Sequence, residues 1–308
     1  MKSITIIAPC HNEELNIDQY LERMINTLTK INIDYKIVFI DDGSTDKTWL
    51  KILEYKKKYN NIFGIKFTRN FGHQAAIMAG INLSDTDYTF CSDVDLQDPP
   101  ELLEKMLKKI QAENLDLVFA KRNNNKETFF KKYSSILFYK LFNLISNTKI
   151  SEQTSDFFII NKRVLLEVKK VNDKDIFLRG LLPWFGFKSS YINFDREIRK
   201  KGNSGWPLFK MIDFSLTAFL SFSNFPMRLS FILSIFSIFI FIILSCYAIY
   251  SYLVGDVVKG WTSMFLIMSF FNTIIFLILG IIGEYVGRNY LNSKNKPLFV
   301  VDKTTLDE

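Results

Sequence analysis

Short apolar runs alternate with amphipathic segments along the first 120 residues of the chain. In the amphipathic segments, apolar residues recur at helical spacing, at Leu21, Ile25 and Leu28 and again at Leu102, Met106 and Ile110. The short runs are mostly apolar and are predicted to be strands, at 4–8, 36–40, 63–67, 88–91 and 115–120. This alternation predicts an α/β domain with a mostly parallel sheet.

The pattern changes after residue 228. Residues 229–255 and 261–283 contain no charged side chain, and each run exceeds the roughly 20 residues that a helix needs to cross a bilayer. We therefore predict two transmembrane helices, at 229–253 and 262–284. The loop between them carries only Asp256 and Lys259 as charges, whereas several Lys and Arg residues flank the pair on both sides. By the positive-inside rule, both flanks face the cytoplasm.

Two further segments complete this organisation. The stretch 205–228 mixes apolar and basic residues and is predicted to be an amphipathic helix in the membrane interface. Residues 287–308 are predicted to be a cytoplasmic tail. The chain is thus expected to be a cytosolic catalytic domain, 1–204, followed by a two-helix membrane hairpin.

Composition narrows the classes of function. The 308 residues include 39 Lys and Arg against 32 Asp and Glu, a net charge of +7 that suits an anionic membrane face or a phosphorylated substrate. The basic residues are scattered and no recognition motif is present, which argues against nucleic acid. Three distant cysteines predict no disulfide framework, and two histidines are too few for a zinc site with Cys/His spacing.

Polar clusters follow three of the predicted strands, at 9–14, 41–44 and 93–97. In open parallel sheets, ligands bind outside the carboxyl ends of the strands, so these clusters mark the candidate site. Neither a GxGxxG loop nor a Walker loop is present. The two common backbone cradles for phosphate are therefore excluded, which favours a metal ion as the means of holding phosphate.

The densest cluster is SDVDLQDPP, residues 92–100. In an extended segment alternate residues share a face, so Asp93, Asp95 and Gln97 would offer three oxygens on one side. Such oxygens suit Mg²⁺ or Mn²⁺ bridging substrate phosphates. Asp98 precedes two prolines and is predicted to be the N-cap of the next helix, with Pro99 at its first position. The structural alternative for the cluster is an acidic turn that only caps this helix.

A series of motifs runs in order along almost the whole chain. They are IIAPCHNEE at 6–14, IDDGSTD at 40–46, TRNFGHQAA at 68–76, DVDLQDPP at 93–100, SDF at 155–157, FLRGL at 177–181 and GEYVGR at 283–288. With its predicted anchor, the chain resembles the polyisoprenyl-phosphate glycosyltransferases, family 2 enzymes of the Rossmann-like GT-A fold with two C-terminal spans. This group includes bacterial prenyl-phosphate glucosyltransferases and dolichol-phosphate mannose synthases.

The resemblance implies roles for individual residues. Those that would line the nucleotide pocket are Pro9, Asn12, Glu13, Asp41 and Asp42. Those that would hold Mg²⁺ or Mn²⁺ on the donor diphosphate are Asp93, Asp95 and Gln97. The residues implied in catalysis are Asp93, Asp95 and Asp156, the last near the sugar. Those that would bind the acceptor phosphate are Arg196, Arg199 and Ser204. For His73, contact with a phosphate and a purely structural hydrogen bond at a helix start both stay open.

The implied activity is the inverting transfer of a sugar from a nucleotide diphosphate sugar, UDP-glucose or a related UDP-sugar, to polyprenyl (undecaprenyl) phosphate. The product would supply sugar for modification of cell-envelope glycans. A phosphate monoester is mostly a dianion at neutral pH, so such an acceptor needs no general base. The resemblance also implies a homo-oligomer, a tetramer, in the cell membrane with both termini in the cytoplasm. The alternatives are an inactive scaffold or lipid-binding module, and a transferase that acts on a glycan acceptor.

Overall fold

A computed structural model describes residues 2–123, 154–171, 176–195, 260–294 and 296–306, with scattered residues between 233 and 250. The chain divides into two compact units. The first comprises Met1–Asn143, Thr148–Ser215 and Pro297–Glu308, and the second comprises Leu144–Asn147 and Leu216–Lys296.

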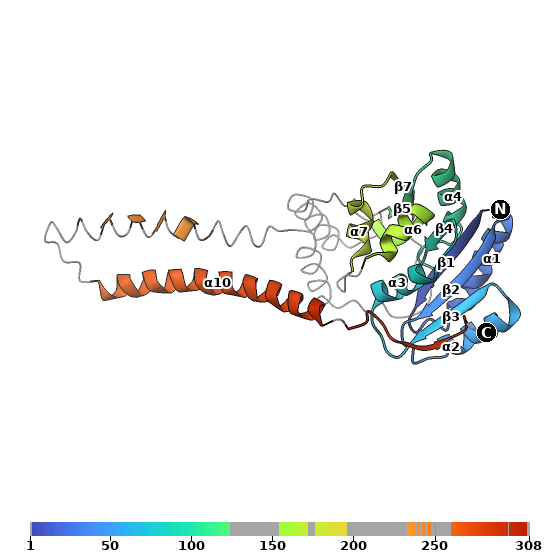
Figure 1. Cartoon of the computed structure of the whole chain (residues 1–308), viewed down its shortest axis with the longest axis horizontal. Helices are drawn as coiled ribbons and strands as arrows, with labels where there is room; N and C mark the ends of the chain where they lie inside the picture. Colours follow the sequence, from blue (N-terminus) through green and yellow to red (C-terminus); the bar gives the residue numbers. More distant parts are fainter. Residues whose placement is uncertain are drawn as a thin grey trace. The chain divides into compact units, whose positions relative to one another are not determined.

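A mixed sheet forms the centre of the first unit, with the strand order β7-β5-β6-β4-β1-β2-β3-β8 (Figure 1). The strands are β1 Ser3–Cys10, β2 Asp34–Asp41, β3 Ile62–Phe67, β4 Tyr88–Cys91, β5 Leu117–Arg122, β6 Thr154–Asn161, β7 Ser189–Phe194 and β8 Val301–Thr304. Within the described part of the chain, β6 and β8 run antiparallel to their neighbours and the other pairings are parallel. The predicted α/β class is confirmed, whereas the sheet is mixed rather than mostly parallel, with three antiparallel pairings among the seven that the described strands make. The five predicted strands match β1–β5 to within two residues at each end.

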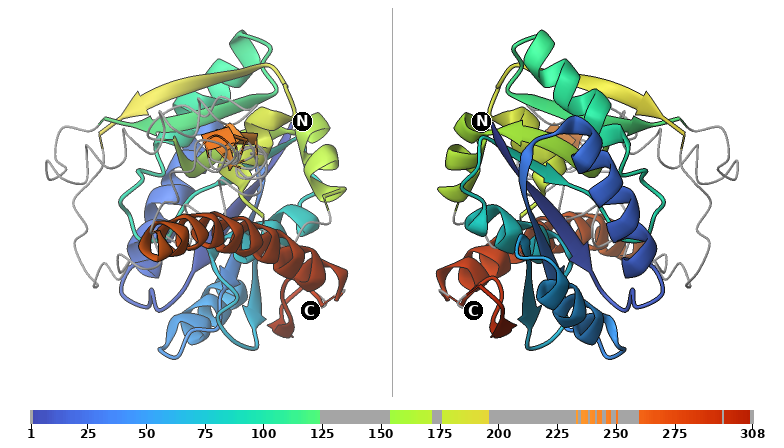
Figure 2. Two further views of the ribbon diagram at one scale, coloured as in Figure 1. Left: turned by 90° about the vertical axis from the view of Figure 1, so that its left-hand side faces the viewer. Right: turned by 90° about the vertical axis from the view of Figure 1, so that its right-hand side faces the viewer.

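Helices cover both faces of this sheet (Figure 2). The helices on one face are α1 Ile17–Ile31, α2 Thr48–Lys58 and α4 Leu102–Ala112, and those on the other are α3 His73–Leu83, α6 Lys162–Lys169 and α7 Leu178–Trp184. Strand β1 packs against the helices on both faces. Ile4 and Ile6 lie in the hydrophobic cluster that contains α1 and α4, whereas Ile7 lies in the cluster that contains α3 and α6. Because both faces are buried, the strands are continuous apolar runs, which made them recognisable in the sequence.

Helix α1 shows why the amphipathic segments fold as predicted. Leu21, Met24 and Leu28 recur at helical spacing and are all buried. Burial of each such side chain contributes about 1.5–3 kcal/mol to the free energy of unfolding. The helix ends where Asn32 adopts a left-handed conformation, φ 54°, and donates its backbone N–H to the Leu28 carbonyl.

The residues that follow the second predicted span add a strand to the first unit. Strand β8 pairs antiparallel with β3 at one edge of the sheet. Next to it, Thr305 is buried and its Oγ1 accepts the Gly64 N–H at 2.8 Å. The segment predicted only as a cytoplasmic tail therefore completes the sheet of the first unit.

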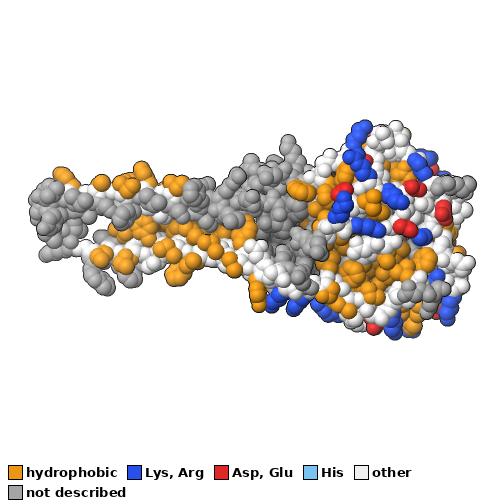
Figure 3. Space-filling view, viewed as in Figure 1, with side chains coloured by type: hydrophobic (Ala, Val, Ile, Leu, Met, Phe, Trp, Pro, Cys, Tyr) orange, Lys and Arg blue, Asp and Glu red, His pale blue; other side chains and the backbone are white. Residues whose placement is uncertain are grey.

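The second unit contains α10, Trp261–Ser293. Among the residues that the structure describes, it is the one helix long and apolar enough to cross a membrane, with its apolar window at Phe270–Gly287. No residue of that window is buried, and Figure 3 shows apolar side chains along the helix. The predicted span 262–284 lies within α10, which continues to Ser293, into the segment predicted as the cytoplasmic tail.

The other membrane predictions fall mainly outside the described residues. The interfacial segment 205–228 is not described. Of the first predicted span, 229–253, only scattered residues are described, and these are helical. A two-helix hairpin therefore stays a prediction.

Candidate active site

The parallel pairing brings three polar clusters to one edge of the sheet. In the register of β1 and β2, Cys10 lies opposite Asp41, and β1 pairs with β4 as far as Ile7 and Cys91. The loops after these three strands therefore start side by side, as expected for a ligand site in such a sheet. Pro9 is tolerated in a central strand because its missing N–H would face β4, whose pairing with β1 has already ended.

The loop after β1 is held to the loop after β2 by backbone and side-chain hydrogen bonds. Asn12, with a left-handed φ of 56°, donates its backbone N–H to Ser44 Oγ at 2.9 Å. Its side-chain Oδ1 accepts the Thr45 N–H at 2.9 Å. The Glu13 backbone N–H is donated to Thr48 Oγ1, also at 2.9 Å. Asn12 and Glu13, both predicted to line the nucleotide pocket, thus fix the shape of this edge.

Asp42 clamps the loop that follows β3. Its Oδ1 accepts the Phe71 N–H at 2.7 Å and its Oδ2 accepts the Gly72 N–H at 3.0 Å. Between the two loops, Gly43 has φ +66°, and a Cβ there would lie 2.3 Å from the carbonyl carbon of Arg69. Only glycine fits this close approach. Asp42 therefore uses both oxygens to hold backbone.

Asp41, its neighbour, has an unused acceptor. Its Oδ1 accepts the Ser44 N–H at 2.8 Å, but its buried Oδ2 accepts no hydrogen bond from the described residues. Lys66 Nζ lies 4.0 Å from that oxygen. Burial raises the pKa of Asp41 above its ordinary value, although the Ser44 hydrogen bond opposes this. A buried acceptor without a donor is costly to the fold unless a ligand completes it.

The segment after β4 differs from the prediction. Asp93, Asp95 and Gln97 were expected to share one face of an extended segment, but the chain turns at residues 94–98. Leu96 is left-handed, φ 62°, and Asp95 Oδ1 accepts the Gln97 backbone N–H at 3.0 Å. The shared-face argument is therefore wrong. An Asp carboxylate that bonds the backbone two residues on favours a turn over an extended strand, and left-handed Leu is a strain typical of functional loops.

Asp98 has a structural role, but not the one predicted. Helix α4 begins only at Leu102, whose backbone N–H is donated to the Pro99 carbonyl, so Asp98 is not its N-cap. Instead Arg122 Nη2 donates to both oxygens of the buried Asp98 carboxylate, at 3.0 and 3.2 Å. The two prolines delay the helix and leave Asp98 facing β5. This ion pair ties the acidic turn to the sheet.

Asp93 is the carboxylate with the most unusual environment. Its side chain is 31% exposed, yet Oδ1 is buried and accepts no hydrogen bond from the described residues. His73 Nε2 lies 3.4 Å from that oxygen. Burial, together with the carboxylates of Asp95, Asp98 and Asp156, raises the pKa of Asp93 to about 6, although His73 acts in the opposite direction. Burial is the larger cause of this shift, and the neighbouring carboxylates add to it.

The donor set at this point fits a divalent cation shared with a substrate. Asp93 and Asp95 offer carboxylate oxygens, which Mg²⁺ and Mn²⁺ prefer. No three His, Cys, Asp or Glu side chains form a complete metal cage in the part of the chain that the structure describes. Mg²⁺ is usually bound by one or two carboxylates, with phosphate oxygens and water filling the other positions. The unpartnered Asp93 oxygen is consistent with that use.

A second carboxylate, that of Asp156 on β6, lies near the same His73 nitrogen as Asp93. Arg179 donates to both of its oxygens, at 3.1 and 2.8 Å, and Gln74 Nε2 donates to Oδ2 at 3.0 Å. His73 Nε2 lies 3.6 Å from Oδ2. Burial alone would raise the pKa of Asp156, but Arg179, with help from His73 and Gln74, holds that pKa below its ordinary value. Asp156 is therefore a fixed carboxylate anion beside Asp93.

The structure adds Gln74 and Arg179, which the sequence left without a role, and brings His73, whose role the sequence left open, close to two carboxylates. His73 and Gln74 are the first two residues of α3, and Arg179 is the second residue of α7. The signal was present, because GHQ and FLRGL belong to the motifs that carry the family resemblance. Their spacing alone does not show that they meet Asp156. The predicted acceptor-phosphate residues Arg196, Arg199 and Ser204 lie outside the described residues.

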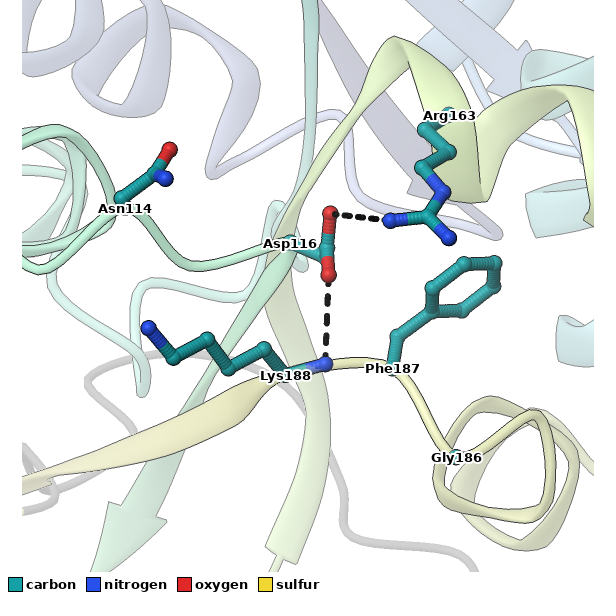
Figure 4. Close-up of a pocket in the computed structure, with 6 residues that line it drawn as sticks. All are labelled: Asn114, Asp116, Arg163, Gly186, Phe187 and Lys188. Carbon is teal, nitrogen blue, oxygen red and sulfur yellow. Dashed lines mark hydrogen bonds and ion pairs between the residues drawn. The ribbon is translucent and has the colours of Figure 1, made fainter.

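A separate pocket lies at the opposite, amino end of β5 (Figure 4). Its lining residues are Asn114, Asp116, Arg163, Gly186, Phe187 and Lys188. The Asp116 carboxylate accepts hydrogen bonds from the Asn161 side chain and the Lys188 backbone, and Arg163 lies 3.9 Å away. This carboxylate is already paired, so the pocket does not share the chemistry of the site at the carboxyl edge.

Comparisons with known proteins identify the family of the chain. The family model "Glycosyl transferase family 2" matches residues 5–169. The uncharacterized glycosyltransferase YkcC of Bacillus subtilis (strain 168) is 36% identical over 307 residues, covering 97% of this chain and 93% of YkcC. A prophage-derived bactoprenol glucosyl transferase of Shigella flexneri is 31% identical over 303 residues, covering 98% of each chain.

A solved structure is also similar in part. Glucosyl-3-phosphoglycerate synthase from Mycobacterium tuberculosis, in complex with Mn²⁺, UDP-glucose and phosphoglyceric acid, is 16% identical with a TM-score of 0.47. The similarity covers 71% of this chain and 79% of that one.

The family assignment rests on the family model and the relatives. The family model covers more than half of the chain and includes β1–β4 with the three polar clusters. The relatives match almost from end to end. The chain belongs to glycosyl transferase family 2 and is a glycosyltransferase.

Proposed function

We propose that the protein transfers a sugar from a nucleotide diphosphate sugar to a polyprenyl phosphate at the cytoplasmic face of the cell membrane. UDP-glucose is the proposed donor and undecaprenyl phosphate the proposed acceptor. The observation that carries this proposal is the group of carboxylates around His73 at the carboxyl edge of the sheet, in which Asp93 keeps a buried oxygen without a hydrogen bond. The similarity to a bactoprenol glucosyl transferase of Shigella flexneri supports the lipid acceptor.

The donor nucleotide is proposed to bind over the loops after β1 and β2. Asp41 Oδ2 is the buried acceptor that a base or ribose donor group would complete. Pro9, Asn12 and Glu13 frame the same edge. Asp42 takes part by holding the loop after β3, because both of its oxygens are bound to backbone N–H groups.

Asp93 and Asp95 are proposed to hold Mg²⁺ or Mn²⁺ on the donor diphosphate. When bound, the cation would neutralise the charge that develops on the leaving diphosphate. Gln97 is proposed as a further ligand on the family resemblance, and its backbone N–H already orients Asp95. Two carboxylates with substrate oxygens satisfy the usual coordination of Mg²⁺.

Asp156 is proposed to orient the sugar. Arg179 and Gln74 keep it ionised and fixed, so it can accept a hydrogen bond from a sugar hydroxyl. The lipid phosphate, a dianion, attacks the anomeric carbon from the face opposite the leaving group. A bond forms from that carbon to a phosphate oxygen, the bond to the donor diphosphate breaks with its electron pair, and the configuration inverts. Arg196, Arg199 and Ser204 are proposed to bind the attacking phosphate.

The membrane placement is part of the same proposal. Helix α10 offers an apolar segment of membrane length, and together with residues 229–253 it would form the two-span anchor. Both termini would then be cytoplasmic. The proposed homo-oligomer, a tetramer, rests on the family resemblance alone.

The test is direct assay of the full-length protein in detergent. The protein is incubated with undecaprenyl phosphate, MnCl₂ and a panel of nucleotide sugars, and lipid products are read by mass spectrometry. We expect one glycosylated undecaprenyl phosphate with a UDP-sugar. Absence of product with every donor would support an inactive lipid-binding module. Product formed only when a glycan is added would support the glycan-acceptor alternative.

A further inference from the structure

The segment 298–305 belongs to the first unit and contacts the loop that Asp42 holds. Helix α10 ends at Ser293, and the first unit resumes at Pro297. Strand β8 then forms the edge of the sheet beside β3. The loop in question, 68–72, starts directly after β3.

Aromatic side chains connect this segment with the loop. The ring of Phe299 stacks on that of Phe67, with the centroids 4.9 Å apart and the planes at 13°. Phe67 is fully buried, and its ring meets that of Phe71 edge-on at 5.8 Å. Phe71 is the loop residue whose N–H is donated to Asp42. Phe299 therefore acts on the loop through one intermediate ring.

Hydrogen bonds to the backbone of β3 and of the loop fix the segment at both ends. The Val300 carbonyl accepts the Thr68 N–H at 3.0 Å, at the first residue of the loop. At the other end, Thr305 and Gly64 exchange hydrogen bonds: Gly64 N–H to Thr305 Oγ1 at 2.8 Å, and Thr305 N–H to the Gly64 carbonyl at 3.0 Å. Thr305 is buried. The segment is thus anchored along β3, and its first residues, which precede β8, support the loop.

The loop has a direct consequence for the site. Gly72, its last residue, donates its N–H to Asp42 and has φ 101°. The next residue is His73, which lies between Asp93 and Asp156. A shift of the loop would therefore move Asp42 and the start of α3 together.

We propose that 298–305 is a positioning segment for the donor site. Phe299 is the residue through which this segment keeps the loop 68–72, and with it His73, in position. Residues 294–297 join this segment to α10 along the chain. The identity of the donor as a nucleotide sugar rests on the proposed function. The hold on the loop does not.

The test compares three variants of the full-length protein in detergent. Phe299→Ala removes the stacked ring, and Phe299→Leu restores apolar volume without the ring. The control is Val301→Thr, a near-isosteric substitution in the same segment at a residue that is 41% exposed. Hydrogen exchange of a peptide covering 68–72 is measured first. KM and kcat are then measured for UDP-glucose with MnCl₂ and undecaprenyl phosphate.

In Phe299→Ala, we expect exchange in 68–72 to become about two- to tenfold faster, the effect of losing one aromatic pair that orders the loop. KM for UDP-glucose should rise by a similar factor of about two to ten, with little change in KM for the lipid. Phe299→Leu should recover part of both effects, and Val301→Thr should match the wild type. A purely structural role would lower the amount of active enzyme, and hence kcat, without changing KM.

Two results would overturn the proposal. Unchanged exchange in 68–72 would show that Phe299 does not hold the loop. Faster exchange with an unchanged KM for UDP-glucose would show that the hold does not position the donor site. If the wild type itself fails to use any nucleotide sugar, the proposed function fails, and the exchange comparison alone decides whether the segment holds the loop. Thr305→Val, which removes the hydroxyl that accepts the Gly64 N–H, provides a second variant if Phe299→Ala does not fold.

Discussion

Replacement of Arg179 by Ala gives the strongest test of the carboxylate arrangement. In the folded protein Arg179 donates two hydrogen bonds to a carboxylate whose side chain is 3% exposed, that of Asp156. Removing one partner of a buried ion pair typically costs about 3–5 kcal/mol, because the other charge is left buried and unpaired. His73 and Gln74 still contact Asp156, so we expect the lower end of that range, about 3 kcal/mol.

The loss should be visible in thermal unfolding of the full-length protein in detergent. For a domain of about 200 residues, each kcal/mol lowers Tm by about 2–4 °C, so Arg179→Ala should melt about 6–12 °C below the wild type. The control is Arg163→Ala: Arg163 is 74% exposed and 3.9 Å from Asp116. An exposed pair of this kind contributes about 1 kcal/mol or less, so its Tm should change little.

The dependence on pH follows from the lowered pKa of Asp156. A carboxyl group whose pKa is lower in the folded than in the unfolded protein stabilises the fold above the unfolded pKa, and loses that contribution as the pH falls through the folded pKa. The Tm difference between wild type and Arg179→Ala should therefore be largest near neutral pH and shrink below about pH 4. The double variant Arg179→Ala, Asp156→Asn should melt above Arg179→Ala, because it removes the orphaned charge.

The reasoning would be refuted by a Tm for Arg179→Ala equal to that of Arg163→Ala, or by a difference that does not shrink on acidification. Either result would mean that Asp156 is not held as a buried anion by Arg179. Its proposed role in orienting the sugar would then lose its physical basis.

Three further predictions address other parts of the site and the anchor. Asp95→Asn should keep the fold but abolish most transfer, and EDTA should stop wild-type transfer until Mg²⁺ or Mn²⁺ is restored; full activity in EDTA would exclude the metal. Gly43→Ala combines a positive φ with a clash at the Arg69 backbone, so the Kd for UDP, measured by calorimetry, should rise about tenfold or more. The control Gly186→Ala has φ +71° but open space around the new Cβ, and should bind UDP as the wild type does. Equal effects of the two substitutions would contradict the clash. Protease added to sealed inside-out vesicles should digest the first unit and spare α10, and protection of the first unit would contradict the cytoplasmic placement.

The sequence by itself determined the elements whose burial has a regular period. Strands β1–β5 are apolar runs because helices cover both faces of the sheet, and α1 repeats its apolar residues because one side of it is buried. The same local reading located the apolar segment of α10. It also placed polar clusters at the ends of β1, β2 and β4, since neighbouring parallel strands end at the same edge. The ordered motifs identified the family.

Only the tertiary structure decided how those polar residues are used. Asp93, Asp95 and Asp98 have the same side chain within six residues, yet one faces His73, one closes a turn and one pairs with Arg122. Nothing local distinguishes them, because each partner is supplied by a different element of the fold.

The same holds for the contacts of greatest sequence separation. The hydrogen-bonded pair Gly64 and Thr305 joins residues 241 positions apart. Strand β8, which this pair anchors, follows the apolar helix α10, and the sequence of that helix does not predict that the chain returns to the sheet. Periodicity reports whether a side chain is buried, but not which partner it meets. That depends on the topology of the chain, and it is why the carboxylate arrangement around His73 and the edge strand β8 emerged only in three dimensions.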